Sequence, residues 1–236
     1  MGSVCIMKPG SWSLFSNQAL LGVNNSLTAG FNYENRFNLA ETGTRMAGII
    51  IPAGRTSLGL CYSHFGYSYF RRSSFGLACG MVLGKNISAG IQVDYFREKT
   101  PGDYKSFNAV TFEGGIFFRP SEKVSAGIHL FNPVPNSLRK TGMPSTLRAG
   151  AGVELNRALF AGAEAEMSTD GSMLVRTGFE YEIIEKLSLR GGFCSEYTSF
   201  TFGLGYKLKS VFIDLAFATH ERLGITSCAS LVFKIK

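Results

Sequence analysis

Long apolar runs are missing from this sequence. No stretch of about 18 consecutive apolar residues occurs, which excludes a transmembrane helix. Charge is also scarce, since Asp, Glu, Lys and Arg make up 17% of the chain, below the roughly 25% typical of soluble domains. A shortage of charge is what a surface that faces lipid requires.

Catalytic and metal-binding patterns are missing as well. The cysteines are odd in number and form no close pair, which predicts neither a zinc site nor a disulfide framework; they stand at positions 5, 61, 79, 194 and 228. The three histidines have no metal-ligand spacing, and neither a nucleophile elbow nor a P-loop occurs. The sequence therefore predicts a protein that is not an enzyme and needs no cofactor.

The net charge of +7 does not predict a nucleic-acid surface, because the Lys and Arg residues are scattered along the chain. The densest basic pairs, Arg71-Arg72 and Arg139-Lys140, fall in predicted loops. Two interpretations stay open for such pairs: solvated loop charge, or contact with anionic lipid headgroups or a partner.

The chain is rich in residues that suit strands: 28 Gly, 20 Phe and 9 Tyr. Between Lys186 and Lys209 apolar and polar residues alternate along two segments joined by a short polar link. Each segment therefore has one apolar and one polar face. In a soluble sandwich the apolar face would be packed, whereas in a membrane barrel it would meet lipid and the polar face would line the lumen.

The same alternation continues from Ser26 to the end of the chain and predicts about fourteen strands. Tight connections alternate with mostly longer ones, as the periplasmic turns and extracellular loops of outer-membrane barrels do. We therefore expect an all-β, antiparallel, up-and-down transmembrane barrel over residues 26–236, located in the outer membrane and in contact with its lipids. Residues 1–25 are expected to form a plug or periplasmic segment, with a helical turn within 12–21 capped at Ser11 or Ser13. The first residues of the sequence do not show the charged region and apolar core of a signal peptide.

An outward apolar face leaves polar residues for the lumen, and their opposite charges predict a network of ion pairs. The candidate members are Glu113, Arg148, Glu164, Arg176, Glu180 and Arg190. Other inward residues include Gln92, Asp94, His129, Glu166, Lys207 and Asp214, with four aromatic candidates at Phe96, Phe117, Phe160 and Phe212. A structural lining is favoured over a ligand site for this network, and inward glycines would allow strand curvature or a close internal plug.

The segment from Trp12 to Ala19 resembles the W-S-x-x-x-N-Q-A-G-L opening of Bacteroidetes outer-membrane proteins of the PorV/PorQ group, relatives of the long-chain fatty-acid transporter barrels, and departs from it at Leu20, where the family usually has Gly. Further matches follow in order at 33–37, 65–68, 88–92 and 131–133. The resemblance implies a barrel of about fourteen strands with an N-terminal segment in or under the lumen. Trp12, Asn17 and Gln18 are then the candidate plug motif, and Met1 lies just inside a mature N-terminus whose signal peptide has been lost.

The resemblance also implies an accessory role in a type IX-like secretion system. In that hypothesis secretion-machinery subunits or secreted cargo bind the loop at 132–145, through the candidate residues Pro133, Pro135, Arg139 and Lys140. One alternative is a channel for hydrophobic small molecules, of the fatty-acid transporter type. The other is a purely structural outer-membrane protein.

Overall fold

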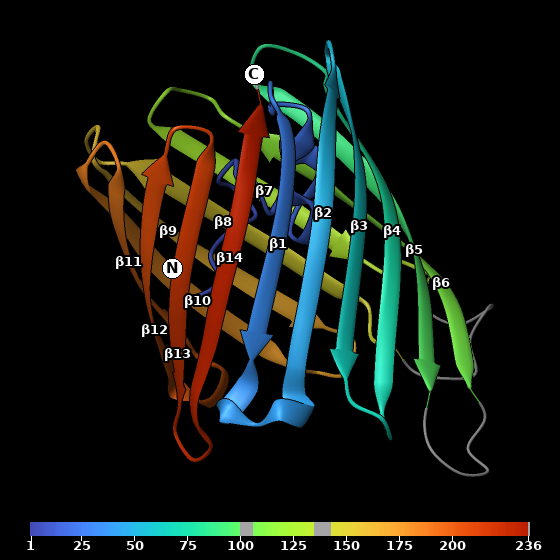
Figure 1. The fold of residues 1–236 in the computed structure, drawn as a ribbon. Coiled ribbons are helices and arrows are strands. Elements are labelled where there is room, and N and C mark those ends of the chain that lie inside the picture. The colour runs from blue at the N-terminus through green and yellow to red at the C-terminus, as the bar shows by residue number, and fades with distance from the viewer. Residues whose placement is uncertain (100–105, 135–142, 236) are drawn as a thin grey trace.

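A computed structural model describes residues 1–99, 106–134 and 143–235, and it shows one closed barrel of fourteen antiparallel strands (Figure 1). Each strand pairs with its neighbours in the sequence, and β14 closes the wall by pairing with β1. Closure removes the exposed edges that an open sheet of this size would carry. The predicted all-β, up-and-down barrel is confirmed.

The strands run from Leu27 to Ile235. Their bounds are β1 Leu27–Asn35, β2 Gly43–Ala53, β3 Thr56–Gly66, β4 Arg71–Val82, β5 Ile87–Lys99, β6 Phe107–Phe118, β7 Val124–Phe131, β8 Thr146–Glu154, β9 Leu159–Ser168, β10 Met173–Ile184, β11 Leu187–Cys194, β12 Ser199–Leu208, β13 Val211–His220 and β14 Gly224–Ile235.

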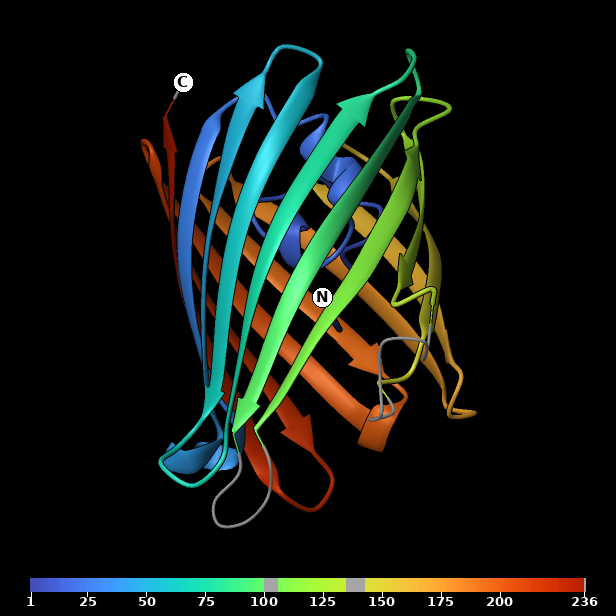
Figure 2. The same ribbon diagram turned by 90° about the vertical axis from the view of Figure 1, so that its right-hand side faces the viewer.

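The helical elements are all short 3₁₀ turns: η1 Ser13–Phe15, η2 Gln18–Leu21, η3 Arg36–Asn38, η4 Ala40–Thr42 and η5 Glu196–Thr198. None of the helices in the described part of the chain is long and apolar enough to cross a membrane. η1 and η2 lie inside the barrel, whereas η3 and η4 form the connection from β1 to β2 at the lower end in Figure 2.

The two ends of the barrel differ in their connections. The tight turns, such as 54–55 and 209–210, lie at the upper end in Figures 1 and 2. The longer loops and η3, η4 and η5 lie at the other end, which we call the loop end.

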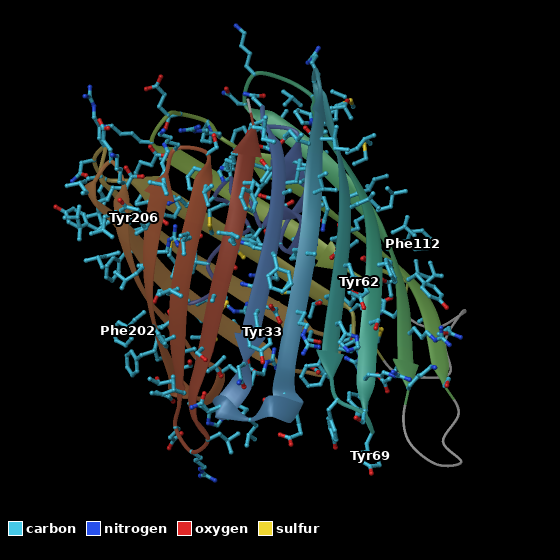
Figure 3. The ribbon with its side chains drawn as sticks, viewed as in Figure 1. Tyr33, Tyr62, Tyr69, Phe112, Phe202 and Tyr206 are labelled. Atoms are coloured by element: carbon cyan, nitrogen blue, oxygen red, sulfur yellow. The ribbon has the colours of Figure 1, made fainter. Side chains whose placement is uncertain are left out.

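The outward side chains of the strands form an apolar belt. Phe112, Phe202 and Tyr206 point away from the wall in Figure 3, and Phe202 keeps 59% of its surface exposed. Most inward positions on the same strands are polar or small, as with Arg190 opposite Gly203 between β11 and β12, whereas inward apolar residues such as Phe117 pack against the N-terminal segment. The apolar face therefore meets lipid and the polar face lines the lumen.

Candidate functional site

The N-terminal segment, residues 1–25, follows the inner surface of the barrel wall. Three groups of its apolar residues are buried against successive strands, which makes the segment the centre of the apolar core. Leu14 and Leu21 pack with Ile50, Cys61 and Ala78 of β2 to β4; Ala19 and Leu20 pack with Phe117 of β6; Val4, Ile6 and Met7 pack with Phe160 of β9.

Glycines in the wall allow the backbone of this segment to come close. A Cβ added to Gly90 of β5 would collide with the Gln18 carbonyl group, and one added to Gly127 of β7 would collide with that of Ile6. A Cβ at Gly178 of β10 would meet the backbone of Met1. These inward glycines therefore form the flat surface of the wall against which the backbone of the segment packs.

Asn17 links parts of the N-terminal segment to one another, and both Asn17, which donates to the Ile116 carbonyl at 3.3 Å, and Gln18 attach the segment to β6. Asn17 Oδ1 accepts a hydrogen bond from the Ala19 backbone N–H at 3.0 Å, and Asn17 Nδ2 donates to the Ile6 carbonyl at 2.8 Å. Gln18 Nε2 donates to Glu113 Oε1 at 2.8 Å. Both side chains are fully buried, so each bond replaces water that the group has lost.

The helical turn predicted between Trp12 and Leu21 is present as η1 and η2, but the predicted caps are wrong. Trp12 precedes η1 and makes no side-chain cap bond, while Asn17 caps η2. Asn is a strong N-cap residue, and its extended backbone lets the side chain reach the Ala19 N–H.

Gly90→Ala is expected to loosen the N-terminal segment, because the new methyl group overlaps the Gln18 carbonyl. Overpacking of this kind costs about 1–3 kcal/mol. Chymotrypsin cleavage after Trp12 or Phe15 should therefore become faster in the folded barrel, as followed by mass spectrometry. Gly114→Ala is the matched control, because a Cβ there faces outward and lies 3.1 Å from the Gly90 carbonyl oxygen. Equal cleavage rates in the two variants would contradict this packing.

Glu164 of β9 is the most enclosed member of the luminal ion pairs. Its side chain has 0% exposure; Oε2 lies 2.5 Å from Arg148 Nη2, and Oε1 accepts the Ile6 backbone N–H at 2.8 Å. Burial raises the pKa of the nearby Cys5 thiol, so Cys5 is a neutral neighbour of Arg148. Arg148 and Glu164 thus connect the N-terminal segment to β8 and β9.

Further ion pairs continue around the lumen. Arg176 binds Glu166 at 2.8 Å, and Arg148 lies 3.5 Å from the same carboxylate. Arg190 pairs with both Glu180 and Asp214, and Lys8 of the N-terminal segment also pairs with Glu180.

Five of the six predicted network residues are thus brought together along β8 to β11, and Glu113 is not. Glu113 on β6 contacts Gln18, Gln92 and His129, with 3.1 Å between His129 Nε2 and Glu113 Oε2. The residue that sequence reasoning missed is Lys8, because no strand pattern covers the segment that carries it. The structural role that the sequence analysis favours for this network stays a prediction.

A cavity of about 610 Å³ lies between the N-terminal segment and the part of the barrel wall that β10 to β14 form. Trp12 and Phe15 line it on one side, and Arg190, Phe212 and Asp214 on the other. Most of the segment packs on β2 to β10, and only its first residues reach β11 and β12, where Gly2 donates to Thr201; the cavity occupies the remaining space beside β11 to β14. Of the four inward aromatic candidates, Phe212 lines the cavity, Phe117 and Phe160 pack against the segment, and Phe96 contacts Phe131.

Little of the candidate partner loop falls among the described residues. Of the candidate partner loop, Pro133 is described and exposed, while Pro135, Arg139 and Lys140 lie outside the described residues. Within 1–99, 106–134 and 143–235 no group of His, Cys, Asp and Glu residues has the arrangement of a metal site.

Comparison with known proteins finds no matching family model and no matching curated protein. Solved structures do match. The toluene transporter TbuX of Ralstonia pickettii has a TM-score of 0.70 at 14% identity, covering 99% of this chain and 95% of that one. The CymD monoaromatic hydrocarbon channel has a TM-score of 0.76 at 12% identity, with 100% and 96% covered. A Pseudomonas aeruginosa FadL homologue has a TM-score of 0.64 at 12% identity, with 99% and 95% covered.

The chain has the fold of these transporter barrels. Its closed wall and apolar belt are those of a multi-pass outer-membrane barrel in contact with the lipid bilayer. The neighbours named above are transporters or channels or, in one case, a homologue of FadL; none is described as an enzyme or as a member of the PorV/PorQ group.

Proposed function

We propose that this barrel carries small hydrophobic molecules across the outer membrane. The observation that supports this function most is the cavity between the N-terminal segment and β11 to β14, which Trp12, Phe15 and Phe212 line. Ligand sites are usually concave, with aromatic walls and a few polar groups. The fold shared with hydrocarbon channels and transporters agrees with such a role.

The charged groups around Arg190 oppose the entry of an apolar ligand less than isolated charges would, because they are already paired with one another. Glu180 is shared by Lys8 and Arg190, and Arg190 also binds Asp214. Groups that satisfy one another need not be desolvated again when an apolar molecule displaces water. The aromatic rings then provide the contact surface.

Filling the cavity is expected to block uptake. Ser11 lines it and is only partly buried, so Ser11→Trp would place an indole ring in the space. Uptake of radiolabelled toluene by cells that express this variant should fall to the level of cells without the barrel. Ser172→Trp is the control, because Ser172 lies exposed in the link between β9 and β10. Equal uptake by both variants would contradict the proposed function.

The secretion-associated role remains a second hypothesis. It rests on the loop 132–145, most of which lies outside the described residues, and none of the structures compared above is described as a secretion component. If it holds, deleting 134–143 should leave the barrel folded and abolish a complex with secretion subunits or cargo in outer-membrane extracts. A complex that survives the deletion would contradict it.

A further inference from the structure

Basic residues gather on the outer surface of β2 to β5, at the loop end. We call this set the rim patch: Arg45, His64, Arg71, Arg97 and Lys99. Outward position follows from alternation with exposed apolar residues on the same strands, such as Phe75 of β4 and Tyr95 of β5. The patch therefore faces the membrane region rather than the lumen.

The strand register brings these side chains next to one another. Arg45 is opposite His64, His64 is opposite Ser73, and Ser73 is opposite Arg97. One step closer to the loop end, Arg71 lies directly opposite Lys99. Like charges in directly opposed positions destabilise a sheet.

No carboxylate relieves this repulsion among the residues that the structure describes. The basic residues of the rim patch form no ion pair there, whereas the inward neighbours Arg72 and Glu98 pair at 2.6 Å. The nearest carboxylate in the strand register, Glu98, is thus paired with Arg72 on the luminal side of the wall. An anion from outside the chain would neutralise the patch.

An apolar hollow of about 280 Å³ lies beside the rim patch on the outer wall. Its floor is Ala47 of β2, which stands in register between Phe31 of β1 and Tyr62 of β3. Arg45 and His64 line its basic end. Tyr33 and Tyr62 mark this part of the wall in Figure 3. A molecule that fits must join an anionic group to an apolar chain.

The rim patch is confined to one side of the barrel. At the loop end of β8 to β10 the outward residues in register are Leu147, Met167 and Met173, all apolar and exposed. A general need for positive charge at this level of the membrane would not produce such a difference. The charge therefore marks a particular site.

We propose that the rim patch and the hollow bind a phosphorylated glycolipid of the outer leaflet, a lipopolysaccharide. Its phosphate groups contact Arg45, Arg71, Arg97 and Lys99, and an acyl chain lies over Ala47 between Phe31 and Tyr62. Arginine suits this ligand because its planar group binds phosphate through two parallel hydrogen bonds. The site is independent of the luminal cavity and of what the barrel transports.

Native mass spectrometry of the intact barrel in detergent, titrated with bisphosphorylated lipid A, tests the proposal. Each arginine near a membrane surface contributes about fivefold to the affinity for anionic lipid, so R71Q/R97Q should bind about 25-fold more weakly. The control R36Q/R222Q removes the same charge at the loop end outside the rim patch and should bind like the unmodified chain. Cooperative unfolding of all three proteins by circular dichroism shows that they are folded.

Three comparisons identify the ligand. Dephosphorylated lipid A should bind as weakly as R71Q/R97Q does, and phosphatidylglycerol should not compete with lipid A. Equal losses in R71Q/R97Q and R36Q/R222Q would overturn the proposal. Equal affinity for phosphatidylglycerol would also overturn it, since any anionic lipid would then suffice, as would full displacement of lipid A by millimolar inorganic phosphate.

Discussion

Removing residues 1–22 is expected to raise the single-channel conductance of the barrel about tenfold or more, because barrels only slightly larger than this one enclose open aqueous channels. In the intact chain η1, η2 and the residues before them occupy the lumen against β2 to β10. Deletion exposes the polar wall and the glycines that the segment covers. Conductance in planar bilayers is the measurement.

Two further proteins make the conductance result specific. Gly90→Ala, which loosens the segment without removing it, should give brief openings, and Gly114→Ala should stay closed like the intact barrel. Heat-modifiable migration on gels shows that each barrel is folded. An unchanged conductance in the folded deletion variant would contradict the idea that the segment obstructs the lumen.

Arg148→Ala is expected to lower the free energy of unfolding by about 3–5 kcal/mol, the usual effect of removing one partner from a buried ion pair. It leaves Glu164, whose side chain has no exposed surface, without its cation. Urea unfolding of the refolded barrel in detergent micelles measures the loss. Arg119→Ala is the matched control: the Arg119–Glu154 pair is 3.4 Å long, with side chains 45% and 52% exposed, so its loss costs below about 1 kcal/mol.

The double variant Arg148→Met, Glu164→Met distinguishes an unpaired charge from lost packing. Replacing a buried pair by apolar residues is often neutral, so the double variant should be more stable than Arg148→Ala. Ile6 loses the acceptor for its backbone N–H, which leaves part of the loss in place. If both variants lose the same stability, the charge on Glu164 is not the cause.

The wall of the barrel could be predicted from the sequence because two local signals agree. Alternation with period two recurs along the whole of 26–236, and tight turns such as 209–210 alternate with longer links such as 36–42. Each hairpin is a local structure, so its length and turn fix where the next strand begins. Closure then follows, since an open sheet of fourteen strands would leave two edges unpaired.

The contacts of the N-terminal segment could not be predicted in the same way. Lys8 meets Glu180, 172 positions later in the chain, only because closure of the wall brings β10 to the segment. Ser11 and Ser13 are as good capping residues as Asn17, and the difference is made by β6 and β7, which pack against Asn17. Glu113 likewise carries an inward charge, but its place opposite Gln92 directs it to Gln18 and His129 rather than to the arginines.

The rim patch could not be predicted from the sequence either. Arg71 and Arg72 read as a loop pair, whereas Arg71 begins β4 and the two side chains lie on opposite faces of the wall. Arg45, Arg71 and Arg97 are far apart in the chain and become neighbours only through the registers of β2 to β5. A single outward charge at a strand end does not indicate which other charges will lie next to it.

The fluorescence of Trp12 tests the central claim most directly, because it is the single tryptophan of the chain and it lines the cavity. The measurement is a titration of the intact barrel in detergent with toluene, with excitation near the red edge of tryptophan absorption. A luminal binding site predicts a saturable change in emission that Ser11→Tyr, which places a ring in the cavity, weakens and that Ser172→Tyr retains; neither variant adds a second tryptophan. A change that is linear in toluene, or identical in both variants, would mean that the hydrocarbon only partitions into the micelle, and would contradict a binding site between the N-terminal segment and the wall.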